Sequence, residues 1–151
     1  MTRRREKIVA AAIGLIFLLA CDRILKYWAL YGLYHTKIDI VPGWLTFELF
    51  KNTALSFSIP MPPVVIIILS ATAVILLAAA LMRRTRRTWD TTETGLALII
   101  TGALSNLYDR LQYGLVIDYI NIRFWPVFNL ADVMISAGVF IIIKALIWRK
   151  K

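Results

Sequence analysis

The stretch from Met61 to Met82 carries no charged side chain and is rich in β-branched residues. A helix needs ~20 mostly apolar residues to cross the hydrocarbon of a bilayer, and this stretch is long enough to do so. Similar apolar runs cover about 8–30, 92–112 and 129–148. The chain is 60% hydrophobic over 151 residues, which is typical of a membrane protein with one domain. We therefore predict an all-α membrane protein, a single integral membrane domain over residues 1–151 with four transmembrane helices.

The net charge of +9 is concentrated in clusters that flank these apolar runs. The basic residues are Arg3, Arg4, Arg5 and Lys7, then Arg83, Arg84, Arg86 and Arg87, then Arg149, Lys150 and Lys151. Four spans place all three clusters on one side of the membrane, and basic flanks favour the cytoplasm. We therefore predict that the N and C termini are cytoplasmic, with anionic phospholipids of the bilayer as the counter-charge. This placement argues against nucleic acid as a partner.

Polar side chains gather at the opposite, outer ends of these helices. They are Asp22 on the first helix, Asn106, Asp109 and Arg110 on the third, Asn129 and Asp132 at the start of the fourth, and Asp118 in the outer connection. A carboxylate in or beside hydrocarbon costs roughly 2.5–3.5 kcal/mol on insertion scales, so each marks a candidate functional site. Their common depth in the membrane strengthens this inference.

Each of these polar groups also has a purely structural explanation. Asn129 and Asp132 are spaced as a helix cap and its partner. Asp109 and Arg110 are also explained as a buried ion pair, with each other or with Asp22 on the first helix. Asp118 is also explained as an ordinary solvated loop carboxylate. The structural explanation needs separate reasons for three carboxylates at one depth, and it leaves Asn52 and Asn106 unexplained. We therefore favour a functional site.

Two of the carboxylates, Asp118 and Asp132, are free to face each other. Carboxylates brought close together do not both ionise easily, so such a pair shares one proton. The ionised member then activates water while the other protonates a substrate oxygen or leaving nitrogen. Arg110 and the asparagines supply hydrogen-bond donors for developing charge. His35 and Cys21 are the single histidine and cysteine, so we expect no disulfide, no zinc site of these ligands, no other metal and no cofactor.

The outer loop over about 36–52 predicts a small β region. Leu45, Phe47 and Leu49 alternate with more polar residues, and Pro42-Gly43 supplies a turn before them. We expect the aromatic rings of this loop, Trp44, Phe47 and Phe50, at the headgroup layer.

Four blocks of the sequence then carry a family resemblance. Lys51–Ser58, Thr101–Arg110, Val116–Ile120 and Phe128–Asp132 resemble, in order and spacing, the signature of the bacterial lipoprotein signal peptidase family, signal peptidase II. With Asp22, the resemblance covers essentially the whole chain. It implies a four-helix aspartyl endopeptidase of the bacterial cytoplasmic (inner) membrane, with a small periplasmic β-cradle and an active site that faces the periplasm at the outer leaflet. Such enzymes remove signal peptides from diacylglyceryl-modified prolipoproteins, cleaving before the lipid-modified cysteine.

The resemblance also implies roles for particular residues. Asp118 and Asp132 match the catalytic dyad. The matches to substrate-binding or orienting positions are Asn52, Asn106, Arg110 and Asn129, and Asp22 and Asp109 match positions that support the structure. The implied partners are prolipoprotein substrates with a diacylglyceryl-cysteine, the phospholipid bilayer and globomycin-type inhibitors. We expect a monomer.

The chain departs from the family pattern at several positions. Ala54-Leu55 stands where Gly-Ala is usual, Ser105 replaces a glycine, and Tyr119 replaces a phenylalanine. We expect Leu55 to narrow the substrate cleft and Ser105 to loosen close helix packing.

Three alternatives remain. The run from Arg3 to Cys21 resembles a lipoprotein signal with its lipid-modified cysteine, but three further spans follow it. A small transporter would use intramembrane carboxylates to bind protons or cations, although such sites lie near the midplane. A non-catalytic lipoprotein-binding relative is the third, and the intact pair of aspartates argues against it.

Overall fold

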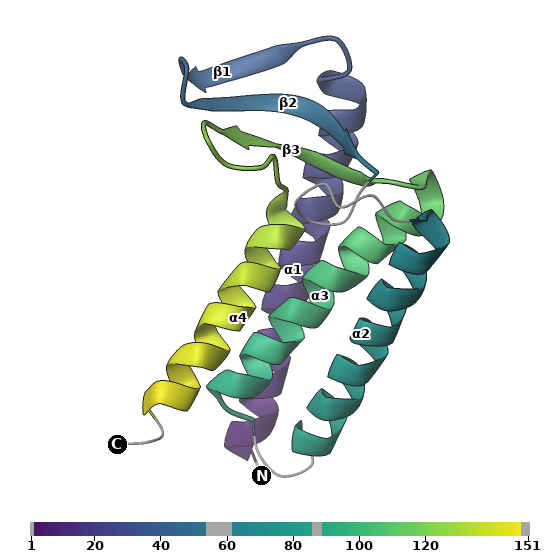
Figure 1. Cartoon of the computed structure of the whole chain (residues 1–151). Coiled ribbons are helices and arrows are strands. Elements are labelled where there is room, and N and C mark those ends of the chain that lie inside the picture. Colours follow the sequence, from purple (N-terminus) through teal and green to yellow (C-terminus); the bar gives the residue numbers. More distant parts are fainter. Residues whose placement is uncertain (1, 54–61, 86–88, 149–151) are drawn as a thin grey trace.

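The computed structural model describes residues 2–53, 62–85 and 89–148. Along the chain it contains α1 (Thr2–Gly32), β1 (Lys37–Val41), β2 (Leu45–Asn52), α2 (Pro63–Thr85), α3 (Thr91–Tyr113), β3 (Val116–Ile122) and α4 (Leu130–Trp148). The helices lie side by side, and the sheet covers one end of the bundle (Figure 1). The start of α1 and the end of α4 lie at the other end.

Three helices of the described chain are long and apolar enough to cross a membrane. They are Arg3–Gly32 within α1, then α2 and α4. The expected fourth span, α3, is not among them because it carries Glu93, Asp109 and Arg110 together with several threonines. The molecule is therefore a mostly helical membrane protein with three candidate spans.

The helices extend past the apolar runs that predict them. α1 begins at Thr2 because the arginine, glutamate and lysine ahead of its apolar run are themselves good helix formers. α2 begins at Pro63, a residue that the first helical position accepts since no hydrogen bond is lost there. Met61, where we expected this helix to begin, lies outside the described residues.

The bundle is organised around α3, which packs against α1, α2 and α4. Its contact with α4 depends on glycines. A Cβ on Gly138 would lie 2.5 Å from the carbonyl oxygen of Gly95, and a Cβ on Gly102 would lie 2.4 Å from that of Ala131. Small residues let two helix backbones approach closely inside a membrane. This contact fixes the distance between the polar ends of α3 and α4.

The sheet has the order β1-β2-β3, and both pairs of strands are antiparallel. β1 and β2 form the predicted hairpin, with Gly43 at its turn in the left-handed region (φ 74°). The third strand was not predicted. β3 pairs with β2 so that Phe50 lies opposite Asp118 and Asn52 opposite Val116. The interpretation of Asp118 as a loop carboxylate is therefore wrong, because this residue lies in a paired strand.

The sheet is fixed to the end of α1 by a small apolar core. Ala29 and Leu33 of α1 pack with Ile117 and Tyr119 of β3, and all four are buried. Phe47 packs against the ring of Tyr119, so it does not face the headgroups as we expected. Trp44 and Phe50 do remain exposed.

Candidate active site

Asp118 lies in the middle of β3 and accepts hydrogen bonds at both carboxylate oxygens. The side-chain amide of Asn52, at the end of the neighbouring strand β2, donates to Oδ2 at 2.9 Å. The side-chain amide of Asn129 donates to Oδ1 at 2.6 Å. Asp118 is only 1% exposed, so these two donors replace much of the water that a carboxylate loses on burial.

Asp132 lies in the first turn of α4 and has two roles. Its backbone N–H donates to Asn129 Oδ1 at 2.9 Å, while its Oδ2 accepts the backbone N–H of Asn129 at 3.2 Å. These reciprocal bonds form a capping box, which is the structural role that their spacing suggested. The other oxygen, Oδ1, accepts the side-chain amide of Asn106 on α3 at 2.8 Å. Asp132 therefore caps α4 and also contributes to the candidate site.

The two aspartates are joined through the two asparagines. Asn129 Nδ2, which donates to Asp118, also lies 3.2 Å from Asn106 Oδ1. Asp118 and Asp132 line one cavity of about 410 Å³, together with Asn52, Asn106 and Arg110. The structure thus brings the predicted dyad and the predicted orienting residues to one place.

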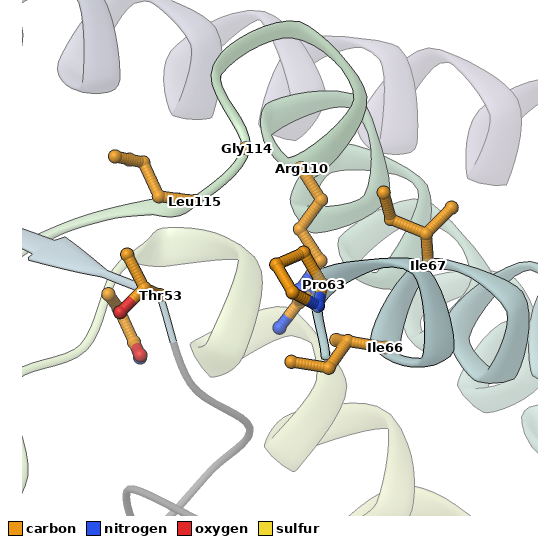
Figure 2. A pocket seen from close by; sticks show the side chains of 8 residues that line it. Thr53, Pro63, Ile66, Ile67, Arg110, Gly114 and Leu115 are labelled. Atoms are coloured by element: carbon orange, nitrogen blue, oxygen red, sulfur yellow. The ribbon is translucent and has the colours of Figure 1, made fainter. Parts of the chain in front are cut away.

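Arg110, near the end of α3, is one of the side chains that line this cavity. It lies beside Pro63 and Ile66 of α2, across from Thr53 at the end of β2 (Figure 2). These four residues line a small pocket, and Arg110 also lines the larger cavity that contains the aspartates.

Asp22 and Asp109 lie behind the site, in a buried ion-pair cluster. Asp109 pairs with Arg23 at 2.7 Å and with Lys26 at 2.7 Å, while Asp22 pairs with Arg23 at 2.8 Å. The ion-pair partners of both aspartates are thus Arg23 and Lys26, not Arg110. Asp22 also accepts the backbone N–H of Ala131 at 2.9 Å, so the cluster ties α1 to the start of α4.

Arg23 and Lys26 lie within the first apolar run, and the sequence pattern does not single them out. One signal was available: Asp22 and Lys26 are four residues apart, a spacing that pairs opposite charges on one helix face. Their connection to α3 had no signal in the sequence.

Two of the departures from the family pattern have structural consequences. Ser105 is buried, and its hydroxyl donates to Asp22 and accepts from Arg23, so it adds a hydrogen-bonded link between α3 and α1. The hydroxyl of Tyr119 accepts the backbone N–H of Leu130 at 3.2 Å. Ala54 and Leu55 lie outside the described residues.

The electrostatics of the site make Asp118 a weaker acid than an ordinary aspartate. Burial, with a smaller contribution from the charge of Asp132, raises the pKa of Asp118 to about 6 against the opposing effect of the hydrogen bond from Asn52. A carboxyl with a raised pKa beside a second carboxylate matches the pattern of a pair that shares one proton.

No group of three histidine, cysteine or acidic residues within 2–53, 62–85 and 89–148 lies close enough to hold a metal ion. His35 is exposed on the sheet side, and Cys21 carries a free thiol. The polar side chains that line the cavity include carboxyl, amide and guanidinium groups.

Comparison with known proteins gives concordant matches. Residues 14–148 match the family model described as signal peptidase (SPase) II. A lipoprotein signal peptidase of Rhodopseudomonas palustris (strain TIE-1) is 34% identical over 151 residues, covering 92% of this chain and 90% of that protein. Another from Clostridium novyi (strain NT) is 31% identical over 82% of this chain and 88% of that protein. A third, from Pelotomaculum thermopropionicum, is 57% identical over 53 residues, 35% of either chain.

Solved structures show the same fold. A bacterial membrane enzyme determined by the in meso method at 2.3 Å resolution superposes with a TM-score of 0.84, covering 95% of this chain and 91% of that one at 22% identity. A second such structure, at 1.9 Å resolution, gives a TM-score of 0.78 at 23% identity. The overall arrangement of helices and sheet is thus that of these membrane enzymes.

Proposed function

Since this chain belongs to the signal peptidase II family, we propose that it is a membrane-embedded aspartyl endopeptidase. It removes signal peptides from diacylglyceryl-modified prolipoproteins and cleaves before the lipid-modified cysteine. One observation carries this proposal: Asp118 and Asp132 line a single cavity and are joined through the amides of Asn129 and Asn106.

The proposed mechanism gives the two aspartates opposite tasks. Asp132, ionised, takes a proton from a water molecule as its oxygen attacks the scissile carbonyl carbon, while protonated Asp118 gives its proton to the carbonyl oxygen. The resulting tetrahedral intermediate collapses when the proton on Asp132 passes to the leaving nitrogen and the C–N bond breaks. One hydroxyl proton of the intermediate returns to Asp118, which restores the pair.

The surrounding donors position these groups and the substrate. Asn52 and Asn129 hold Asp118 in place through their side-chain amides. We assign the guanidinium of Arg110 to a peptide carbonyl of the substrate, since it offers several donors in a fixed plane. The cavity continues between α2 and α4, where Ser70 and Ser136 line it. We propose that it receives the chain segment beside the lipid-bearing cysteine.

We also propose that α3 is a fourth span, because its charges are neutralised inside the bundle. Glu93 is fully buried and pairs with Arg84 at 2.7 Å, and Asp109 is fully buried in the ion-pair cluster. Residues 1–151 then form one integral domain with both termini cytoplasmic. The sheet and the dyad face the periplasm at the outer leaflet of the bacterial inner membrane. This face also fits globomycin-type inhibitors, and we expect a monomer surrounded by phospholipid.

The test is a cleavage assay with the purified protein in lipid bilayers. A diacylglyceryl-modified prolipoprotein and the same precursor without the lipid are incubated separately, and the products are identified by mass spectrometry. We expect the modified precursor alone to be cut efficiently, with a new N-terminus at the modified cysteine and with inhibition by globomycin. Cleavage at another peptide bond, or no cleavage, would contradict the proposal.

A further inference from the structure

Lys26 of α1 is buried, with only 1% of its surface exposed. Its ammonium lies 2.7 Å from Asp109 Oδ2 and 3.4 Å from Asp22 Oδ2. It also donates to the side-chain oxygen of Asn106 at 2.8 Å. An ammonium has three N–H donors, and three acceptor side chains lie around this one. One of the three belongs to a residue that contacts the proposed dyad.

We propose that Lys26 is a positioning residue of the peptidase: its ammonium fixes the side-chain amide of Asn106 so that the amide nitrogen faces Asp132. The proposal rests on the proposed function, because it assigns a task to Lys26 in that reaction. Lys26 acts through Asn106.

The orientation follows from the donor and acceptor chemistry of an amide. A primary amide has an accepting oxygen and a donating nitrogen, while an ammonium only donates. The oxygen of Asn106 must therefore face Lys26, and the amide of Asn129 donates to the same oxygen at 3.2 Å. The nitrogen of Asn106 is left to donate to Asp132 Oδ1 at 2.8 Å.

This orientation selects a protonation state. A donor aimed at a carboxylate favours its ionised form, while an amide oxygen in the same place would favour the protonated form. Without the ammonium, the 3.2 Å bond from Asn129 still holds the oxygen of Asn106, but it competes less well with a turn of that oxygen toward Asp132, which then keeps a proton. The proposed water-activating base would be lost.

Charge acts in the same direction as orientation. The charged groups around Lys26 are Asp22 and Arg23 on α1 and Asp109 on α3, and its charge also acts on Asp118 of β3 and Asp132 of α4. The positive charge of Lys26 opposes the rise in the pKa of Asp118. Removing it alone would also leave Asp109 short of a partner and destabilise the fold, so a single substitution does not isolate the orienting role.

The experiment therefore removes a charge pair. Lys26→Met/Asp109→Asn deletes one positive and one negative charge together, and the dyad keeps nearly the same net field. We expect this protein to fold, with kcat about tenfold or more below that of the wild type and KM within about threefold, because general acid–base catalysis is weakened more than binding. The acidic limb of the pH–rate profile should move to higher pH.

Two further variants distinguish positioning from a structural role. Lys26→Gln/Asp109→Asn retains an N–H donor without the charge, so it should recover part of the lost rate and move the acidic limb back. In an Asn106→Ala background, the Lys26→Met/Asp109→Asn change should lower kcat no further, because its intermediary is gone. Lys37→Met, at an exposed lysine of β1, is the control and should match the wild type.

The outcomes separate the two proposals. Wild-type cleavage with an unmoved acidic limb in the folded double variant would overturn the role of Lys26 and leave the peptidase function intact. If the Lys26→Met/Asp109→Asn change lowers kcat by the same factor in the Asn106→Ala background as in the wild type, the role of Lys26 is likewise overturned and the peptidase function is left intact. A wild-type protein that does not cleave a lipidated prolipoprotein would overturn the peptidase function, and the role of Lys26 with it.

Discussion

At the scale of single residues, the site depends on which member of the pair holds the proton. Burial is the main cause of the raised pKa of Asp118, and the charge of Asp132 adds to it, so we propose that Asp118 holds the shared proton while Asp132 is ionised. The amide of Asn106, held by Lys26, favours the same assignment. In this proposal Asp118 is the general acid and Asp132 is the general base.

A pH dependence follows from this assignment. Because the pKa of Asp118 is raised to about 6, its proton is present below that pH and is lost as the pH rises through it. We expect kcat/KM to fall on the alkaline side with an apparent pKa near 6. Asn52→Leu should move this limb to higher pH, since it removes a bond to the ionised form. Initial rates measured across pH in lipid nanodiscs check both statements, and an alkaline limb that Asn52→Leu lowers would contradict them.

The residues that the sequence predicts and those it misses differ in a physical way. Asp118, Asp132 and Asn106 stand out because a polar group near hydrocarbon needs a reason. Arg23 and Lys26 do not stand out, because a basic residue within an apolar run is read as an interruption of that run. Their function becomes clear only from their buried partner on another helix. Partners of that kind are fixed by tertiary packing alone.

At the scale of helices and strands, long apolar runs are enough to predict the helices because each run exceeds the thickness of the hydrocarbon. β3 is short, has an aspartate at its centre and pairs with the distant strand β2. Its partners are distant in sequence, so no local pattern identifies it. The positions of the glycines, by contrast, determine how closely α3 and α4 approach.

Gly102→Ala should therefore separate these two helices. Its Cβ would lie 2.4 Å from the carbonyl oxygen of Ala131, so α4 must move, and the 2.8 Å bond from Asn106 to Asp132 must lengthen. We expect a loss of roughly 1–3 kcal/mol of stability and a lower cleavage rate. Thermal unfolding followed by tryptophan fluorescence, with the cleavage assay, measures both.

Gly14→Ala is the matched control for this substitution. A Cβ at Gly14 of α1 meets no atom within 4 Å, and alanine is the better helix former. The melting temperature of this variant should stay level or rise. Equal losses in both variants would show that the close contact between α3 and α4 is not the cause.

At the scale of the whole molecule, we propose that the two ends of the bundle face different compartments. The basic residues at the start of α1 and at the end of α2 lie at the end of the bundle away from the sheet (Figure 1), where Arg4 donates to the carbonyl oxygen of Thr85. Because basic flanks favour the cytoplasm, we propose that the sheet end faces outward.

Cysteine labelling tests this orientation. In a Cys21→Ala background, Lys37→Cys on β1 and Lys7→Cys near the start of α1 both place a thiol at an exposed position. A membrane-impermeant maleimide applied to intact spheroplasts should label the β1 variant alone, and the α1 variant should react only after the membrane is opened. The reverse pattern would contradict the topology.

The central claim is that Asp118 and Asp132 act as one catalytic pair, and single substitutions test it most directly. Asp118→Asn and Asp132→Asn each keep the shape of the side chain and remove its acid–base chemistry. Asp39→Asn, at a partly exposed carboxylate of β1, is the control. With all three proteins folded, we expect each of the first two to lower the rate of lipidated prolipoprotein cleavage by at least about 10²-fold, and the control to keep the wild-type rate. Full activity in either Asp118→Asn or Asp132→Asn would contradict the account.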